Sequence, residues 1–288
     1  MKLGAVFPQL ESGSDPLAIR DYAQAVEALG YSHIVAYDHV LGAEISTRPN
    51  WSGPYTSDSV FHELFVLFGY LAGLTRSVEL VTGVLILPQR QTALVAKQAA
   101  EVDLLSGGRL RLGIGVGWNE VEYEALNENF RNRGARSEEQ IALLRALWAD
   151  PAISFKGRWH SIDNAGLNPL PPRRAIPIWI GGYSEATLQR VGAMGDGWFP
   201  WRPPSDEMRA QIARVHAYAQ EAGRDPAAIG LEPQLSPARL PEREWEPFVQ
   251  GWRELGATHL CVNTMGAGCA TLDAHVALLR RVKERLGL

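Results

Sequence analysis

Cysteine is scarce in this sequence of 288 residues, which contains only Cys261 and Cys269. The two thiols form no CxxC pair and no other redox or metal-binding motif, so we expect reduced cysteines in a cytoplasmic protein. No run of about 18 apolar residues is present, which argues against a membrane-spanning helix. The apolar stretch after Met1 is too short for a secretory signal. The sequence therefore predicts a soluble protein with no membrane partner.

Lysine and clustered histidine are also rare, and their scarcity excludes several reaction classes. None of the four lysines follows an apolar strand, as a Schiff-base enzyme would require. The seven histidines form no HxH or HExxH pattern, so no metal site is expected. The net charge of −4 and the scattered arginines do not provide the basic surface that a nucleic-acid partner needs.

What the chain does have is a regular alternation of short apolar runs and helical patterns. Eight runs read as strands, at 3–7, 33–37, 78–87, 110–116, 176–180, 197–200, 229–235 and 259–263. Strands that alternate with helices form parallel sheets, and eight repeats favour a closed barrel. We expect an α/β protein with a (β/α)8 TIM barrel as a single domain over residues 1–288.

Two segments are longer than the barrel needs. Residues 41–59 have no clear period and read as a functional loop. Residues 118–175, between the fourth and fifth strands, read as an insertion with a helix at 137–148 and a hairpin around 155–159.

Active sites of such barrels lie at the carboxyl ends of the strands, so the residues there are the candidates. Asp38 and His39 follow the second strand and could form an acid–base pair, although a loop cap with a solvent-facing histidine is the commoner arrangement. Gly181 and Gly182 precede Ser184, a helix cap, and this turn could bind phosphate or be a plain turn. Trp118 could contact an aromatic ligand or fill the barrel mouth.

Taken together, these stretches resemble the luciferase-like monooxygenase superfamily, and in particular its coenzyme F420-dependent branch. Single pieces are weak, but their order and spacing are specific across nearly the whole chain. The stretches that carry the resemblance are Gly4–Gln9, Tyr37–His39, Thr82–Pro88, Ala96–Gln98, Leu105–Arg109, Gly113–Trp118, Gly134–Arg136, Leu144–Trp148, Phe155–Gly157, Ile180–Gly182 and Gly195–Trp198.

The resemblance implies a flavin-type ring across the barrel mouth and assigns roles to the candidates. The residue matching Asp38 contacts the ring, and the residue matching His39 lies near its reactive carbon, so His39 is the first candidate for proton handling. The second catalytic candidate is a residue of the stretch Gly117–Glu122, from which Glu120 is chosen. A cis peptide bond at Gly83–Val84 is expected to push a bulge against the ring. The remaining cofactor contacts implied are Gly117, Trp118, Gly181, Gly182 and Gly197.

The resemblance also implies the reaction, which is hydride transfer between reduced F420 and a small organic substrate that the sequence does not identify. Two alternatives stay open: an FMN-dependent monooxygenase that uses O2, and a flavin-binding protein without catalysis. A homodimer is also left open.

Overall fold

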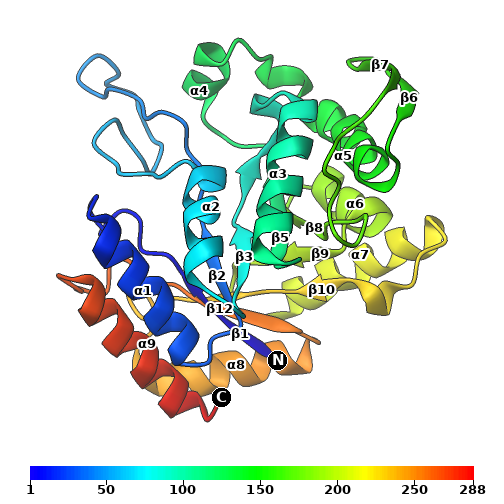
Figure 1. Ribbon diagram of the computed structural model, residues 1–288. Helices are drawn as coiled ribbons and strands as arrows, with labels where there is room; N and C mark the ends of the chain where they lie inside the picture. The colour runs from blue at the N-terminus through cyan, green and yellow to red at the C-terminus, as the bar shows by residue number, and fades with distance from the viewer.

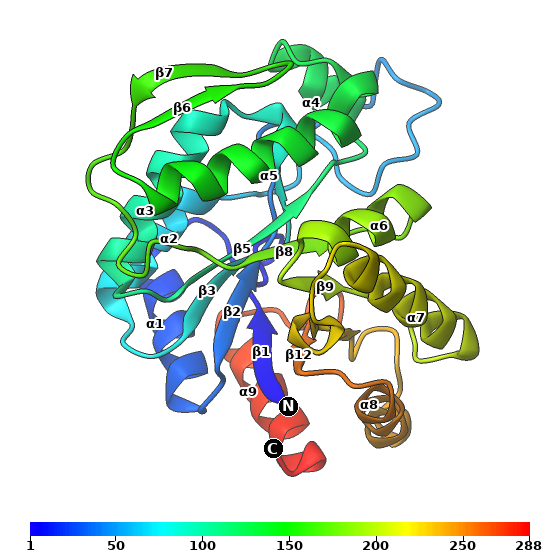
Figure 2. The same ribbon diagram turned by 90° about the vertical axis from the view of Figure 1, so that its right-hand side faces the viewer.

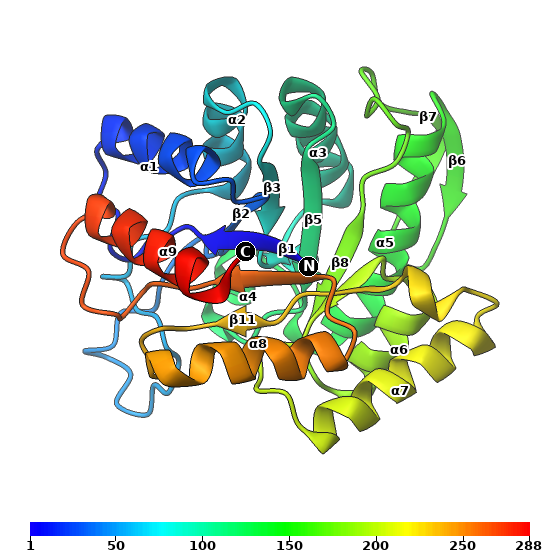
Figure 3. The ribbon, with the colours of Figure 1, turned by 90° about the horizontal axis from the view of Figure 1, so that it is seen from below.

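The computed structural model describes residues 1–288. Its centre is a parallel sheet whose strands pair in the order β10-β9-β8-β5-β3-β2-β1-β12-β11, with β4 beside β5. Figure 3 shows these strands inside a ring of helices. The strands are β1 (Lys2–Val6), β2 (His33–Ala36), β3 (Glu79–Thr82), β4 (Leu85–Ile86), β5 (Leu110–Gly115), β8 (Ile178–Gly181), β9 (Gly197–Phe199), β10 (Gly230–Leu231), β11 (Gln234–Leu235) and β12 (His259–Val262).

One interrupted strand closes the sheet into a barrel. β10 pairs with β9, and β11 pairs with β12. Only Glu232 and Pro233 separate these two segments, and both residues continue the pairing. Glu232 N donates to Trp198 O at 3.0 Å, and Pro233 O accepts from Cys261 N at 3.0 Å. β3 and β4 form a second interrupted strand, so the predicted eight-stranded α/β barrel is confirmed.

Eight long helices surround the barrel (Figures 1 and 3). The first is typical, because Asp15 caps it by accepting from Leu17 N at 2.9 Å and its inner face buries Ile19, Tyr22 and Val26. The helices are α1 (Pro16–Ala28), α2 (Leu64–Leu74), α3 (Thr92–Ser106), α5 (Arg133–Ala149), α6 (Glu185–Met194), α7 (Asp206–Glu221), α8 (Trp245–Glu254) and α9 (Leu272–Leu286). None is long and apolar enough to cross a membrane.

The long connections gather at the carboxyl end of the barrel. The region 118–175 contains the short helix α4 (Glu120–Ala125), α5, and an antiparallel hairpin of β6 (Ile153–Lys156) and β7 (Ser161–Ala165). In Figure 2 the hairpin, α4 and the irregular segment that precedes α2 lie at the same end of the molecule. The predicted helix and hairpin are present, whereas α4 was not predicted, and the bounds of α8, which follows the seventh strand, were not given. Four 3-10 turns complete the chain, at Leu87–Gln89, Phe130–Asn132, Pro226–Ala228 and Glu242–Glu244.

The barrel interior is apolar toward the carboxyl ends of the strands and charged toward their amino ends. Val6, Val35, Val81, Trp179, Phe199 and Cys261 form the apolar cluster. Beneath it, Glu232 contacts the buried His33 ring at 2.8 Å and the Arg111 guanidinium. Burial would raise the pKa of Glu232, but the cation Arg111 and the bond from His33 hold it well below its ordinary value. A buried charge is tolerated only when it is paired in this way.

Candidate functional site

A cavity of about 590 Å³ opens at the carboxyl ends of the strands. That volume is in the range of small-molecule and cofactor pockets. The cavity combines apolar walls with a few polar groups that converge from different strands. Its lining includes Tyr37, Asp38, His39, Tyr55, Gly83, Val84, Ile86, Gly115, Gly117, Trp118, Gly181, Gly182, Tyr183, Ser184, Phe199, Trp201, Gln234, Arg239 and Asn263.

His39 is held in the cavity wall by a carboxylate. Its Nδ1 lies 3.1 Å from Oε2 of Glu122, which is fully buried in α4. Oε1 of Glu122 accepts from the backbone N–H of Val40 at 2.7 Å and of Leu41 at 3.3 Å. Burial would raise the pKa of Glu122, but the His39 bond and charge and these two N–H groups lower it below its ordinary value. Glu122 is therefore an anion that orients the imidazole.

This arrangement determines which imidazole nitrogen is available for chemistry. An ionised carboxylate can only accept hydrogen bonds, so Nδ1 of His39 carries a proton. Nε2 makes no hydrogen bond within the protein, yet it is not among the enclosed polar atoms. It is the atom that can exchange a proton with a ligand. The ring is packed edge-on by Phe61 at 4.6 Å and Tyr55 at 4.8 Å between centroids.

Both carboxylate oxygens of Asp38 accept hydrogen bonds from the protein. Oδ1 accepts from Arg90 at 2.8 Å, and Oδ2 accepts from Ile86 N at 2.9 Å. Burial raises the pKa of Asp38, and Arg90 partly offsets this effect. Asp38 lines the cavity, and its carboxylate also ties the end of β2 to β4.

Val84 projects into the cavity from the interruption between β3 and β4. The Gly83–Val84 peptide bond is cis, as the family resemblance implied. The Val84 side chain lies between two glycines on neighbouring strands. A Cβ at Gly115 would lie 2.5 Å from Val84 Cγ2, and one at Gly181 would lie 3.0 Å from Cγ1. The three residues form a smooth apolar platform against which a planar ring can lie.

Gly181, Gly182, Tyr183 and Ser184 form the turn that leads into α6. Ser184 Oγ accepts from Thr187 N at 3.3 Å, and Gly182 has a φ of +121° that favours glycine. The turn lines the cavity at the start of a ten-residue helix, and the amino end of a helix is a favourable place for an anionic group.

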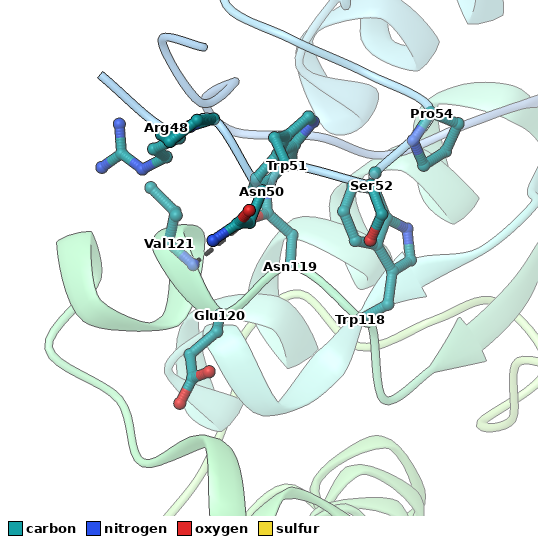
Figure 4. A pocket seen from close by; sticks show the side chains of 11 residues that line it. Arg48, Asn50, Trp51, Ser52, Pro54, Trp118, Asn119, Glu120 and Val121 are labelled. Atoms are coloured by element: carbon teal, nitrogen blue, oxygen red, sulfur yellow. Dashed lines mark hydrogen bonds between the residues drawn. The ribbon is translucent and has the colours of Figure 1, made fainter. Parts of the chain in front are cut away.

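Two of the predicted site residues lie elsewhere. Gly197 is buried at the start of β9, where a Cβ would meet the Trp179 ring at 2.2 Å, and it does not line the cavity. Glu120 is exposed and borders a neighbouring hollow of about 720 Å³ formed by residues 48–54 and 118–121. Figure 4 shows its carboxylate directed away from Trp51 and Trp118. Trp118 stands between the hollow and the cavity, 5.7 Å from the His39 ring.

Sequence reasoning did not single out several residues of the site. Glu122 lies in the predicted stretch Gly117–Glu122, but Glu120 was chosen in its place. Tyr37 follows β2, Gln234 begins β11 and Asn263 follows β12, and their hydroxyl and amides meet in the cavity wall. Asn263 is the last residue of the predicted eighth strand, but no signal joined it to the other two.

The residues present fit a flavin-type cofactor. Tyr183 Oη and Trp201 Nε1 are enclosed polar atoms without a protein partner, and both residues line the cavity. A ring with heteroatoms would satisfy them, Val84 would support its apolar face, and the α6 turn would receive a phosphate. No group of three or more His, Cys, Asp or Glu side chains could hold a metal ion.

Comparison with known proteins adds relatives of two cofactor types. The family model described as luciferase-like monooxygenase matches residues 1–279. An uncharacterised protein of Mycobacterium tuberculosis is 35% identical over 208 residues, which cover 70% of this chain and 71% of that protein. The F420-dependent hydroxymycolic acid dehydrogenase of the same organism is 31% identical, covering 74% and 57%. The FMNH2-dependent dimethylsulfone monooxygenase of Pseudomonas fluorescens is 29% identical, covering 69% and 52%.

Among solved structures, an F420-dependent secondary alcohol dehydrogenase in complex with an F420-acetone adduct superposes with a TM-score of 0.79. The match covers 99% of this chain and 98% of that one at 17% identity. At that identity the likeness concerns the fold.

Proposed function

Because the chain belongs to the luciferase-like monooxygenase family, we propose that it is an oxidoreductase that transfers a hydride between coenzyme F420 and a small organic substrate. The family contains both F420-dependent dehydrogenases and FMN-dependent monooxygenases. The observation that carries the proposal is the His39–Glu122 pair at the wall of a cavity that also contains the Val84 platform. Hydride transfer to or from an alcohol or carbonyl also moves one proton, and this pair supplies a site for it.

Each residue then has a physical task. The deazaflavin, when bound, supplies or accepts the hydride. Val84 would support one face of the ring and leave the other face to the substrate. Nε2 of His39 takes the hydroxyl proton when an alcohol is oxidised, and returns a proton to oxygen when a carbonyl is reduced. Glu122 stabilises the imidazolium that forms. Gly181 and Gly182 bind the phosphate of the cofactor tail.

Cofactor titration tests the first half of this proposal. We expect the purified protein to bind F420 more tightly than FMN, measured by the fluorescence of each cofactor. Equal or tighter FMN binding, with O2 consumed during turnover, would assign the monooxygenase reaction instead. Binding of either cofactor without turnover on a broad panel of alcohols and carbonyls would assign a non-catalytic flavin-binding protein.

Substitution of His39 tests the second half. His39→Ala should lower kcat by about 10²–10⁴-fold, the usual range for general acid–base catalysis, and should leave the cofactor Kd nearly unchanged. His216→Ala, on the outer helix α7, is the matched control and should keep wild-type kcat. An unchanged kcat in a folded His39 variant would remove His39 from the mechanism.

A further inference from the structure

Three polar side chains meet on the side of the cavity that faces the α6 turn. Tyr37 follows β2, Gln234 begins β11 and Asn263 follows β12. In the closed ring of strands, β8 and its glycine turn stand opposite β1, which lies between β12 and β2. A ligand anchored by an anion at the α6 turn therefore extends across the barrel mouth toward these three residues.

The direction of each hydrogen bond in this group follows from one backbone N–H. Met265 N donates to Asn263 Oδ1 at 3.0 Å, so Asn263 Nδ2 must be a donor. Nδ2 donates to Gln234 Oε1 at 3.2 Å and to Tyr37 Oη at 3.1 Å. Since Gln234 Oε1 accepts, its Nε2 donates to Tyr37 Oη, at 2.7 Å. Both lone pairs of the Tyr37 hydroxyl are occupied, and its proton has no acceptor in the protein.

The Tyr37 hydroxyl is also fixed in place and in protonation state. The fully buried Gln9 side chain pairs with both backbone groups of Tyr37, accepting from its N–H at 3.1 Å and donating to its C=O at 2.8 Å. Burial raises the pKa of Tyr37 well above its ordinary value, so the hydroxyl remains protonated at neutral pH. The Tyr37 hydroxyl is therefore a preorganised donor whose hydrogen can point only into the cavity.

Other donors stand on the same wall. The Trp201 ring lies 5.5 Å from the Tyr37 ring, and its enclosed Nε1–H has no protein partner. Arg239 also lines the same cavity. An enclosed donor without a partner carries a free-energy cost. A ligand atom that accepts a hydrogen bond would remove this cost.

We propose that Tyr37, oriented by Gln234 and Asn263, is a specificity-determining donor that binds an acceptor oxygen of the ligand. A carbonyl or carboxylate oxygen satisfies this wall, whereas an amine or N–H would face donors only. This inference rests on the proposed function, because the oxygen belongs either to the dione edge of the cofactor ring or to the substrate bound beside it.

Three variants separate the donated proton from the side chain that carries it. Tyr37→Phe removes the hydroxyl and keeps the ring. Gln234→Glu introduces a carboxylate that accepts the Tyr37 proton and so turns it away from the cavity. Gln234→Met is the control, since it removes one bond to Tyr37 but leaves the proton free to point at the ligand.

Two titrations then identify the source of the oxygen. The first measures Kd for F420 and for FMN, together with the absorption maximum of the bound ring. The second measures benzoate and benzylamine binding to the protein alone and to the cofactor-loaded protein, through the change in tryptophan fluorescence. For whichever ligand supplies the oxygen, we expect Tyr37→Phe and Gln234→Glu to raise the Kd by about tenfold, the value of one hydrogen bond. Gln234→Met should raise it by less than about threefold.

The pattern of losses decides the outcome. A tenfold loss for the cofactor, with a shifted absorption maximum, assigns the oxygen to the ring. A loss for benzoate, but not for benzylamine, assigns it to the substrate. Losses below twofold in both titrations overturn the inference. If wild-type protein binds neither cofactor, the proposed function fails, and the benzoate titration on the protein alone still tests Tyr37.

Discussion

At the residue scale, the orientation of His39 depends on one of two glutamates that stand two positions apart. Glu120 and Glu122 both belong to α4, where successive residues are rotated by about 100°. One carboxylate is therefore directed into the barrel and the other into solvent. The sequence could not decide between them, because α4 and its cap at Asn119 were not recognised.

Glu122→Gln should lower kcat by about 10–100-fold, a range typical of residues that hold a catalytic or metal-bound histidine in place. The amide oxygen would still accept from Val40 N–H, so its NH2 would face Nδ1 of His39. That contact forces the proton of the neutral ring onto Nε2, the wrong tautomer for accepting a proton. Loss of the anion also disfavours the imidazolium that forms when His39 accepts a proton, and steady-state kinetics measure the resulting loss of kcat.

Glu120→Gln is the matched control for this experiment. Its carboxylate is exposed and makes no hydrogen bond with the protein, so kcat and its pH profile should stay at wild-type values. If Glu120→Gln proved the slower enzyme and Glu122→Gln behaved as wild type, the positioning role would belong to Glu120.

At the element scale, the strands were predictable but their interruptions were not. Each strand is a local apolar run, which the sequence shows directly. The break at Glu232–Pro233 falls where the strand changes partner from β9 to β12, at a proline that has no N–H to donate. The break after Thr82 was expected only through the family resemblance, since nothing in Gly83–Val84 itself distinguishes it from a core strand.

The interruption between β3 and β4 matters because neighbouring strands leave room for Val84. Gly115→Ala places a Cβ 2.5 Å from Val84 Cγ2, so Val84 must move into the space of the ring. We expect cofactor binding to weaken by at least about tenfold, with overpacking lowering the free energy of unfolding by about 1–3 kcal/mol. Fluorescence titration and urea unfolding measure the two effects.

Gly73→Ala in α2 controls for the loss of glycine itself. This residue is exposed, and nothing lies within 4 Å of an added Cβ. Alanine should stabilise the helix by up to about 1 kcal/mol and leave cofactor binding unchanged. Unaltered cofactor affinity in Gly115→Ala would show that the platform does not support the ring.

At the scale of the whole molecule, the charged layer below the barrel core makes stability depend on pH. His259 packs against Trp179 with 4.9 Å between centroids, and burial together with Arg111 lowers its pKa to about 3. The unfolded chain binds a proton at this residue below about pH 6.5, while the folded protein does not. The free energy of unfolding should therefore fall as the pH drops from about 6.5 toward 3.

His259→Asn should flatten this dependence by up to about 1.4 kcal/mol per pH unit, the slope of one proton. Urea unfolding at several pH values between 7 and 5 measures the slope. The same substitution at His216, on the outside of α7, is the control. A slope that does not change in the His259 variant would show that this ring is protonated in the folded protein as readily as in the unfolded one.

The outer surface carries an apolar face that one copy of the chain leaves uncovered. α2 has no charged residue, and Val66 is 74% exposed on it. The adjoining α3 exposes Leu94 and, at 64%, Leu105. The two helices lie side by side (Figure 1). Large exposed apolar side chains on two adjoining helices are typical of protein interfaces, and a two-fold axis would place the same face on each partner.

We therefore expect a homodimer whose interface contains α2 and α3. Its sedimentation coefficient should fall toward the monomer value only when the protein is diluted to low concentration. The double variant Val66→Lys with Leu105→Lys would place four charges in the interface and should give a monomer at tens of micromolar protein, because each uncompensated buried charge costs several kcal/mol. Ile45→Lys, an exposed apolar side chain in the loop before α2, should leave the dimer intact. A wild-type chain that sediments as a monomer at these concentrations would contradict the assignment, as would a double variant that remains dimeric.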